Sequence, residues 1–558
     1  MRLLLVTLAA LAGVFVLLLA VRFGTALSLV LALRFRPGGA HEVDPEDLPR
    51  ELDPVFRAAG EILEGWGFRY SFAMWLDSPE ASEPPRPAHV WVHDASGTSA
   101  TLIPPIYYNG SRAWDVSFET EYEDGTVVFT GDSIEHVSFP LPDGWEFQDG
   151  YRNDVEAQWR AHLAALEAHA ERGAPLPPGP VLVLGRNRRV LASGVERWRA
   201  MGLLAPEGAE GDRFRPRAAF GFARRLIAGS DRVARLERAR LRSSTGRPGD
   251  PEVWRAAEAY ALERTRTMEA GRKASPRTRW ILLLVSLPVS ALALGLLFGW
   301  DLVASILLVL LVHELGHALG MVLFGYKDPQ IFFIPFLGAV ATGDKEDASP
   351  FQELVVLLLG PVPGIVLGFW LMSVAPPGTW WAELALVGLV LNYVNLLPFM
   401  PLDGGRIVET VLLGRFPRVQ FFFVAASAAV AGAAGWLLGD GILQFLAIML
   451  ALSLPSKWRW SQGARLLQPH LKPDLDGRGR AEAVYRVLEE PPFTRLAQAQ
   501  RLALAKSLLR FAARPRTGLG FVLLGMLLYT AAVVGPPVGY LMGASPTVDT
   551  IEAQEGLP

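Results

Sequence analysis

The chain contains no cysteine among its 558 residues. This absence excludes disulfide bonds, thiolate metal sites and cysteine nucleophiles, although it says little about the compartment. An excess of one charge is also lacking, because 53 lysines and arginines stand against 56 aspartates and glutamates. The overall balance conceals a strong local asymmetry, since many of the arginines gather in one stretch of the chain.

Long apolar runs are what the sequence contains instead. Hydrophobic residues make up 51% of the chain, the mean hydropathy is +0.26, and 16 tryptophans suit anchoring at a membrane interface. Residues 3–33 can form one long helix, a helix with an interfacial segment, or a hairpin, and we expect an anchor because a convincing signal-peptide cleavage site is missing. Runs long enough to cross a bilayer lie near residues 3–21, 280–299, 302–324, 351–374, 382–400, 420–437, 441–455 and 518–543.

Three ionisable residues stand in the middle of one of these runs. His313 and His317 are four residues apart, with Glu314 between them, in LVASILLVLLVHELGHALGMVLF. On a helix this spacing places both imidazoles on one face, where they can bind one Zn²⁺ while Glu314 activates a bound water. The alternative is a group of side chains that only satisfy each other by hydrogen bonding. Ionisable residues inside a membrane are functional candidates by default, which favours the metal site.

A tetrahedral zinc site needs a third protein ligand, and in a chain without cysteine that ligand must be His, Asp or Glu. The best candidate is Asp403, in the downstream segment LNYVNLLPFMPLDGGRI. Two prolines interrupt the preceding apolar helix, and we expect the glycine pair after Asp403 to let the backbone bend toward the bundle interior. An ordinary interfacial turn would account for the glycines, but not for Asn392 and Asn395 in the same helix.

These two segments together resemble the site-2 protease family of intramembrane zinc metalloproteases. Residues 313–317 are similar to its HExxH helix, and residues 395–404 are similar to its NxxPxxPLDG motif, in the expected order. The resemblance implies zinc ligands, a general base and acid, and a residue that steadies the scissile carbonyl or its oxyanion. The implied zinc ligands are His313, His317 and Asp403. The implied general base and acid is Glu314, and the residue that steadies the carbonyl or oxyanion is Asn395.

The resemblance covers about residues 279–455 and includes one departure from the family pattern. Residues 332–338, FFIPFLG, look like the family's membrane-dipping loop. Many members carry an asparagine after a Gly-Pro pair, whereas Gly364 takes that place in GPVPG at 360–364. A second asparagine is therefore missing from the position where it would help to hold the substrate. Nothing outside this region resembles a PDZ or CBS module.

We therefore expect a metalloendopeptidase with zinc as its cofactor, which hydrolyses peptide bonds in or near the transmembrane segments of membrane-anchored substrates. A helical substrate must unwind locally to expose its carbonyls. The alternatives are a metal-dependent enzyme acting on lipid or a small molecule, a metal transporter, and a catalytically silent membrane scaffold or metal-binding membrane protein. Asn395 and the two-part motif favour peptides, and the presence of both catalytic and ligand groups argues against a silent protein.

The distribution of basic residues predicts the orientation. Loops 325–350 and 402–419 and the segment after residue 455 carry lysine or arginine, whereas the alternate short loops carry none. The positive-inside rule then places these loops, the region before Arg279 and segment 456–516 in the cytoplasm. We expect an integral protein of the bacterial plasma (inner) membrane, with its large soluble region cytoplasmic and its acidic tail outside.

The region between the first anchor and Arg279 is long enough for one or two soluble domains. A helical pattern around 46–64 precedes alternating runs at 89–93, 114–118 and 126–129, and Asp-Gly at 124–125 predicts a hairpin between the last two. The pattern indicates an α+β domain. His89 and His93 share one strand face, but without a third ligand we favour a packing or surface role over a second metal site.

Residues 186–247 hold 16 arginines against 6 acidic residues. Attraction to anionic lipid headgroups explains this stretch economically, and a solvated, arginine-rich helix face explains it as well. No nucleic-acid partner is expected, because no recognition module is present. Residues 494–513 form a basic amphipathic helix that can lie on the membrane or pack on the soluble domain.

The sequence thus predicts a polytopic α-helical membrane protein, with six to eight transmembrane helices and an α+β cytoplasmic domain. The oligomeric state is left open. The expected parts are an N-terminal anchor (1–36), the α+β domain (37–173), an arginine-rich helical segment (181–275), the catalytic membrane core (279–455), a cytoplasmic helical segment (456–516), a last transmembrane helix (517–543) and an acidic tail (544–558).

Overall fold

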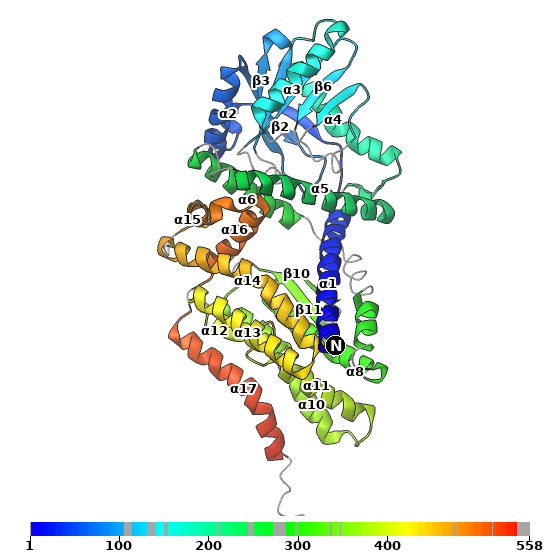
Figure 1. Ribbon diagram of the computed structural model, residues 1–558, viewed down its shortest axis with the longest axis vertical. Coiled ribbons are helices and arrows are strands. Elements are labelled where there is room, and N and C mark those ends of the chain that lie inside the picture. Colours follow the sequence, from blue (N-terminus) through cyan, green and yellow to red (C-terminus); the bar gives the residue numbers. More distant parts are fainter. Residues whose placement is uncertain are drawn as a thin grey trace, which may run out of the picture. The chain divides into compact units, whose positions relative to one another are not determined.

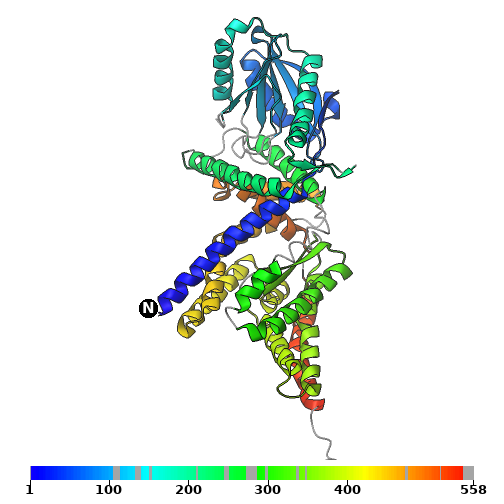
Figure 2. The ribbon, with the colours of Figure 1, turned by 90° about the vertical axis from the view of Figure 1, so that its right-hand side faces the viewer.

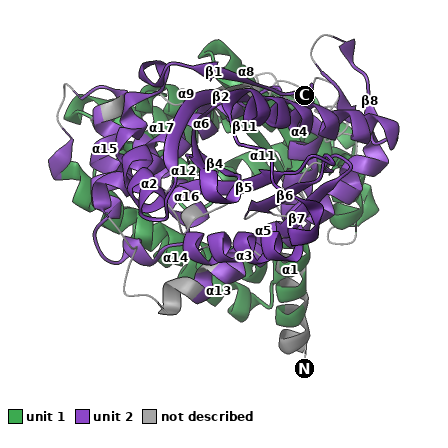
Figure 3. Cartoon of the chain, turned by 90° about the horizontal axis from the view of Figure 1, so that it is seen from above, with its two compact units in different colours: residues 1–18, 275–468, 510–558 green, residues 19–274, 469–509 purple. Residues whose placement is uncertain are grey.

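The computed structural model describes residues 2–104, 114–131, 140–149, 154–208, 211–243, 250–271, 286–295, 299–334, 338–345, 348–471, 475–515 and 517–543. The chain divides into two compact units, which Figure 3 colours separately. We call residues 1–18, 275–468 and 510–558 the membrane unit, and residues 19–274 and 469–509 the soluble unit, after the regions predicted from the sequence. Each unit is therefore assembled from separate stretches of the sequence.

The soluble unit is built on a seven-stranded sheet whose strands follow one another in chain order (Figure 1). Neighbouring strands are antiparallel, except for the parallel pair β6 and β7. The strands are β1 (Gly39–Val43), β2 (Arg69–Asp77), β3 (Arg86–His93), β4 (Thr98–Ile103), β5 (Asp115–Glu121), β6 (Val127–Gly131) and β7 (Trp145–Asp149). The sheet and its helices confirm the predicted α+β region.

Alternation along the strands gives the sheet two faces that are covered by different helices. One face packs against α2 (Asp53–Gly65) and α3 (Val155–Ala168), and α6 (Pro251–Gly271) completes that core. The other face packs against α4 (Pro180–Ala200) through Val183 and its neighbours. Each large apolar side chain that is fully buried in this way contributes about 1.5–3 kcal/mol. The residues with the largest rings in the first core are Phe56, Phe68, Trp91, Trp114, Phe118, Trp159 and Trp254.

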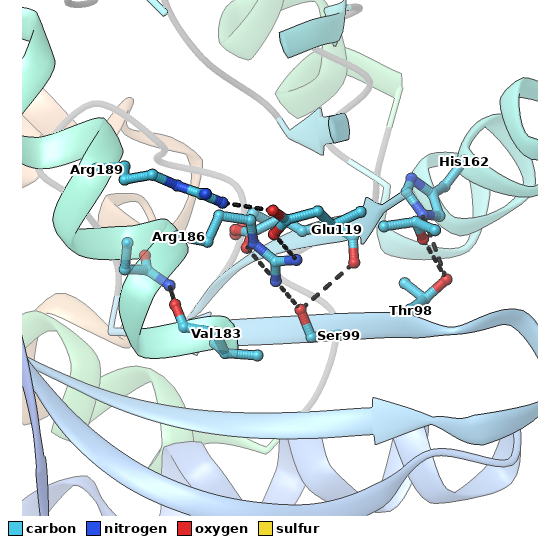
Figure 4. Close-up of polar contacts among 11 residues, drawn as sticks. Thr98, Ser99, Glu119, His162, Val183, Arg186 and Arg189 are labelled. Atoms are coloured by element: carbon cyan, nitrogen blue, oxygen red, sulfur yellow. Dashed lines mark hydrogen bonds and ion pairs between the residues drawn. The ribbon is translucent and has the colours of Figure 1, made fainter. Parts of the chain in front are cut away.

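A buried ion pair lies on the α4 face of the sheet, as Figure 4 shows. Arg186 of α4 is 1% exposed, and its Nε donates to a carboxylate oxygen of Glu119 on β5 at 2.8 Å. A second guanidinium nitrogen donates to the hydroxyl of Ser99 on β4. The charge of Arg186 is thus met inside the unit by the charge of Glu119.

A buried histidine lies on the opposite face. His162 of α3 is fully buried, and its ring nitrogens contact the hydroxyls of Thr98, Thr120 and Thr130 at 2.8–3.4 Å. Burial, together with the charge of Arg186, lowers the pKa of His162 to about 3, so the ring is neutral at pH 7. Hydroxyls can donate or accept, so they satisfy both nitrogens of a neutral imidazole.

The structure confirms the predicted strands and corrects one helix boundary. Residues 89–93 lie in β3, residues 115–118 in β5 and residues 127–129 in β6, and the turn between β5 and β6 contains Gly125 at φ +82°. The helix predicted around 46–64 begins only at Asp53. The residues before it form two short 3₁₀ turns, because prolines interrupt the helical pattern there.

His89 and His93 pack against neighbouring side chains. The ring of His89 stacks on Phe56 with the centroids 3.9 Å apart, and burial lowers the pKa of His89 to about 4. Nδ1 of His93 lies 2.7 Å from the hydroxyl of Ser96. These contacts are of the kind expected for a packing role.

The arginine-rich stretch divides into two groups. In α4 and around strands β8 (Leu204–Ala205) and β9 (Arg213–Phe214), five arginines pair with acidic residues. These pairs are Arg186 with Glu119, Arg189 with Glu121, Arg197 with Asp143, Arg199 with Asp212 and Arg213 with Glu207. In α5 (Pro216–Ser243) the exposed arginines are Arg217, Arg224, Arg225, Arg232, Arg235 and Arg238. The two explanations given for the arginine-rich stretch, attraction to lipid headgroups and a solvated helix face, therefore concern mainly the exposed arginines of α5.

The C-terminal segment 456–516, which was expected to be cytoplasmic, contributes α15 (Gly477–Leu488) and α16 (Gln498–Ala513). Arg501 of α16 is 2% exposed and donates to both carboxylate oxygens of Glu258 on α6, at 2.8 and 2.6 Å. Of the two roles expected for residues 494–513, this buried pair supports packing on the soluble domain. A helix lying on the membrane would need its basic face free.

Five helices of the membrane unit are long and apolar enough to cross a bilayer, by length and composition, within the described residues. They are Trp300–Leu323, Pro350–Val374, Pro417–Leu438, Gly441–His470 and Leu519–Met542. The corresponding elements are α8 (Val303–Leu323), α9 (Pro350–Leu359) with α10 (Pro361–Val374), α13 (Pro417–Leu438), α14 (Gly441–Leu467) and α17 (Leu519–Gly543). Helices α13 and α14 run side by side (Figures 1 and 2).

The predicted count of six to eight spans stays a prediction. The run near 382–400 forms α11 (Trp380–Asn395), whose 16 residues are fewer than a typical span requires. The run near 280–299 is described as an apolar helix only over Ser286–Gly295. At the N-terminus α1 (Arg2–Ala32) is one continuous helix, the first of the three possibilities for residues 3–33. The acidic tail 544–558 lies outside the described residues.

Candidate metal centre

Helix α8 carries both predicted histidine ligands on one face. Its sequence is apolar and free of proline from Val303 to Leu323, so the helix continues through His313 and His317 without interruption. The imidazole ring centroids are 4.7 Å apart, and both residues are buried. The i, i+4 spacing thus directs both rings into the interior of the helix bundle.

Asp403 reaches the same place from a different part of the chain. Helix α11 ends at Asn395, residues 396–402 form a tight turn with a cis Met400–Pro401 peptide, and α12 (Asp403–Val411) begins directly at Asp403. The carboxylate is 8% exposed as a residue and faces the two imidazoles. The structure therefore brings the three predicted metal ligands together.

Gly404 and Gly405 act differently from the expectation, which was that they let the backbone bend. Both lie within the first turn of α12 and have no positive φ. A Cβ at Gly404 would stand 2.0 Å from the carbonyl oxygen of Leu396, and one at Gly405 would stand 2.4 Å from that of Phe399. The glycines are needed because the preceding turn packs directly on the helix start, so their contribution is space and not flexibility.

Three ligand atoms converge in the buried cluster. Nε2 of His313 lies 3.0 Å from Oδ2 of Asp403, and Nε2 of His317 lies 3.2 Å from the same oxygen. The two Nε2 atoms are 3.1 Å apart. Among the described residues this is the group whose ligand atoms all lie within 4.8 Å of one another.

The hydrogen-bond partners of the two Nδ1 atoms, which face away from the cluster, indicate where the ring protons lie. Nδ1 of His313 lies 2.8 Å from Oδ1 of Asn392, whose Nδ2 donates to the carbonyl of Gly388 at 2.7 Å. Nδ1 of His317 lies 2.8 Å from the carbonyl oxygen of Val356. Since both partners are acceptors, both Nδ1 atoms carry a proton, and in the neutral rings both Nε2 atoms present lone pairs to the carboxylate.

This arrangement fits a metal ion. A proton can bridge two of the three converging acceptors, whereas a cation is bound by all three at once. Zinc binds nitrogen and oxygen ligands at about 2.0–2.1 Å in tetrahedral geometry, which separates neighbouring ligand atoms by about 3.3 Å. The observed separations of 3.0–3.2 Å between the ligand atoms are close to this distance. Two imidazoles and a carboxylate also leave a fourth position open, as catalytic zinc sites do.

Glycines allow the neighbouring helix to approach the cluster. A Cβ at Gly316 would lie 2.0 Å from the carbonyl oxygen of Leu359, and a Cβ at Gly360 would lie 2.4 Å from Nε2 of His317. Any larger residue at either position would push α9 and α10 away from α8. The close packing is also what brings the carbonyl of Val356 to His317.

Glu314 lies beside the cluster and is 5% exposed. The backbone of Ala341 lies near its carboxylate. Ala341 belongs to β11 (Gly338–Asp344), which pairs antiparallel with β10 (Lys327–Ile334) to form a two-stranded sheet. The expected membrane-dipping loop is thus a hairpin, and residues 335–337 at its tip lie outside the described residues.

Two asparagines of α11 differ in their placement. Asn392 is 1% exposed and contacts His313, whereas Asn395, three residues later, is half-buried. In the described part of the chain, Asn395 takes no part in the hydrogen bonds around the histidines. No role was assigned to Asn392 from the sequence, although a second amide inside an apolar helix was the signal that could have found it. The carbonyl of Val356 leaves no sequence signal at all.

Comparison with known proteins finds relatives of the membrane part of the chain. Residues 302–379 match the family model described as Peptidase family M50. The chain is 34% identical to stage IV sporulation protein FB of Bacillus subtilis over 131 residues, covering 22% of this chain and 45% of that protein. It is 29% identical to a zinc metalloprotease of Methanocaldococcus jannaschii over 179 residues, covering 30% and 51%. The chain thus spans about half the length of these curated relatives.

Among solved structures, the site-2 protease from Methanocaldococcus jannaschii matches 31% of this chain and 86% of its own, with 24% sequence identity and a TM-score of 0.26. The family match begins at Leu302, runs through α8 and its HExxH residues, and ends within the segment that leads to α11. The resemblance predicted from the sequence is confirmed to this extent: residues 302–379 of the chain match peptidase family M50, the site-2 protease family.

Proposed function

We propose that this protein is an intramembrane zinc metalloprotease that hydrolyses peptide bonds in or near the transmembrane segments of membrane-anchored proteins. The observation that carries the proposal is the convergence of three metal-ligand atoms within 3.2 Å, next to a buried glutamate on the same helix. The relatives that are named zinc metalloproteases support zinc as the ion. His313, His317 and Asp403 would hold it.

The remaining groups have roles that their positions support. When bound, zinc acidifies water and polarises a carbonyl. Glu314 takes the proton of the attacking water and later passes it to the leaving amine, a role for which general acid–base catalysis contributes about 10²–10⁴-fold. Asn395, at the end of α11, is proposed to steady the scissile carbonyl or its oxyanion in the presence of substrate. The amide is half-buried, so it retains contact with the space outside the cluster.

The hairpin supports binding of an unwound substrate. The backbone of Ala341 lies near Glu314, so β11 runs past the proposed catalytic carboxylate. An extended peptide that adds to the sheet along β11 would have its own carbonyls held near Glu314. Substrates with helix-weakening residues near the cleavage site are therefore favoured, because their carbonyls are freed from i to i−4 hydrogen bonds at low cost.

We further propose an integral protein of the bacterial inner membrane whose soluble unit is cytoplasmic. The basic residues of loops 325–350 and 402–419 support this orientation. The exposed arginines of α5 make anionic lipid headgroups the ligand we propose for that surface. Gating of substrate access and recruitment of substrates are the two roles that we propose for the soluble unit.

The test uses purified full-length protein in liposomes with a panel of transmembrane peptides. Wild type should contain about one zinc per chain and cleave at least one peptide. Glu314→Gln should retain the zinc and lose about 10²–10⁴-fold in cleavage rate, because the base is removed while the ligands stay. Asp403→Ala should lose both zinc and cleavage.

Glu383→Gln is the matched control. Glu383 is another glutamate of the membrane unit, and it accepts a hydrogen bond from Ser305 at 2.6 Å. Ser305 precedes His313 by eight residues, about 12 Å along α8. This variant should bind zinc and cleave as wild type does. Stoichiometric zinc with equal cleavage by Glu314→Gln and wild type would contradict the proposed mechanism, and folded protein without zinc would instead support a catalytically silent scaffold.

A further inference from the structure

We propose that Asn392 is a positioning residue for the metal centre, and that Gly364 is the empty place which its side chain requires. The inference rests on the proposed function, because it concerns the imidazole that would bind zinc. Asn392 comes from α11, Gly364 from α10 and His313 from α8. The three helices meet at this point.

The hydrogen bonds of Asn392 determine which nitrogen of His313 is free. Nδ2 of Asn392 donates to the carbonyl of Gly388, one turn earlier on the same helix, so Oδ1 must face His313. Oδ1 can only accept, and it therefore keeps the proton of His313 on Nδ1. The lone pair of His313 is then on Nε2, which points at Asp403 3.0 Å away.

Burial makes this contact decisive. Asn392 is 1% exposed and His313 is 3% exposed, so water does not replace either partner. Outer partners of metal-binding histidines fix the tautomer and the ring orientation, and their loss typically costs 10–100-fold in metal affinity. The ring of His317 has a backbone carbonyl in the equivalent position, which no side-chain substitution removes.

Gly364 has no side chain because Asn392 occupies that space. A Cβ at Gly364 would lie 2.4 Å from Nδ2, 2.9 Å from Cγ and 3.1 Å from Oδ1 of Asn392. Even alanine would therefore displace the amide from His313. An asparagine at position 364 would overlap with the amide that α11 supplies at the same place.

Gly388 offers a matched control on the same helix face. A Cβ at Gly388 meets only Cγ2 of Val309 at 3.8 Å and the carbonyl oxygen of Gly364 at 4.0 Å, which are ordinary contacts. Gly388→Ala therefore adds the same methyl group beside Asn392 without moving it. The carbonyl of Gly388 still accepts from the amide.

The experiment measures zinc affinity of the full-length protein in detergent by competition with a chelator, and folding by circular dichroism. Asn392→Leu, which has a similar size and no acceptor, should weaken zinc binding by about 10–100-fold. Gly364→Ala should weaken it by a similar factor. Asn392→Asp should stay within about threefold of wild type, because a carboxylate also accepts from Nδ1–H. Gly388→Ala should bind zinc as wild type does.

These arms separate a positioning role from packing. A packing role alone predicts that Asn392→Asp, which buries a charge, binds zinc worse than Asn392→Leu, and that result would overturn the proposal. Wild-type affinity in folded Asn392→Leu or Gly364→Ala would also overturn it. Failure of wild type itself to bind zinc would instead reject the proposed function, so the two failures are distinguishable.

Discussion

Two buried polar clusters, one in each unit, differ in how their hydrogen bonds close. In the soluble unit, Arg186 donates to Glu119 and Ser99, so a cation and its acceptors are all supplied by the chain. In the membrane unit, His313, His317 and Asp403 turn three acceptors toward one point. Both clusters are buried, so water does not provide hydrogen bonds to the polar groups of either one.

The difference separates a structural cluster from a binding site. Burying charge costs several kcal/mol per ion unless partners compensate it, and the soluble cluster holds its partners permanently. In the membrane cluster the histidines donate outward through Nδ1, to acceptors on Asn392 and Val356, and these acceptors turn the Nε2 lone pairs inward. Burial of a polar group by itself is therefore not a sign of function. What indicates a binding site is a set of acceptors that face one another without a donor from the chain between them.

The largest expected effect comes from breaking the soluble cluster. Arg186→Met leaves Glu119 buried without its cation, and removal of one partner of a buried pair destabilises a protein by about 3–5 kcal/mol. Hydrogen exchange of peptides from β4 and β5 should show this loss, while zinc affinity stays unchanged. Arg160→Met, which removes an exposed i, i+4 partner of Glu156, is the control and should cost no more than about 0.5 kcal/mol. Equal exchange in both variants would remove the contrast between the clusters.

The membrane cluster should respond to metal where the soluble cluster does not. Free zinc at 100 times its Kd should stabilise the membrane unit by about 2.7 kcal/mol, because the ion binds only the folded site. Exchange in α8 and α12 should slow on zinc addition, and a chelator should reverse the change. Asp403→Asn should abolish this response without destabilising the metal-free protein, because it removes an acceptor from a group of acceptors. Slower exchange in β4 and β5 on zinc addition would contradict the separation.

The effect that is smallest near neutral pH, and grows only in acid, is the contribution of His162. Its folded pKa is lowered to about 3 from an ordinary value of 6.5, so the unfolded chain binds the proton more readily. The stability that depends on the neutral ring is complete above pH 6.5 and is lost as the pH falls toward 3, by about 1.4 kcal/mol per pH unit. His162→Gln should flatten this part of the stability profile of the soluble unit. An unchanged slope in the variant would assign the acid sensitivity to other groups.

Local patterns in the sequence predicted what depends on neighbouring residues. The alternating runs became β3, β5 and β6, since side chains on a strand repeat every two residues. The spacing of His313 and His317 placed both rings on one helix face. The helix expected from residue 46 failed in its first turn, because the short-range effect of proline outweighed the apolar periodicity.

The sequence by itself determined that the candidate metal ligands are nitrogen and oxygen atoms, because the chain has no cysteine. It also determined which helix carries two of the three ligands. The tertiary structure decided how Asp403 meets His313 across 90 residues, and which outer partner sets the protonation of each ring. It also showed that Gly364, Gly404 and Gly405 provide room for close contacts. The physical reason is that periodicity reports which residues share a face of one helix or strand, whereas the contacts that bring the acceptors together join separate helices. A backbone carbonyl such as that of Val356 is present in every residue, so no residue type marks it.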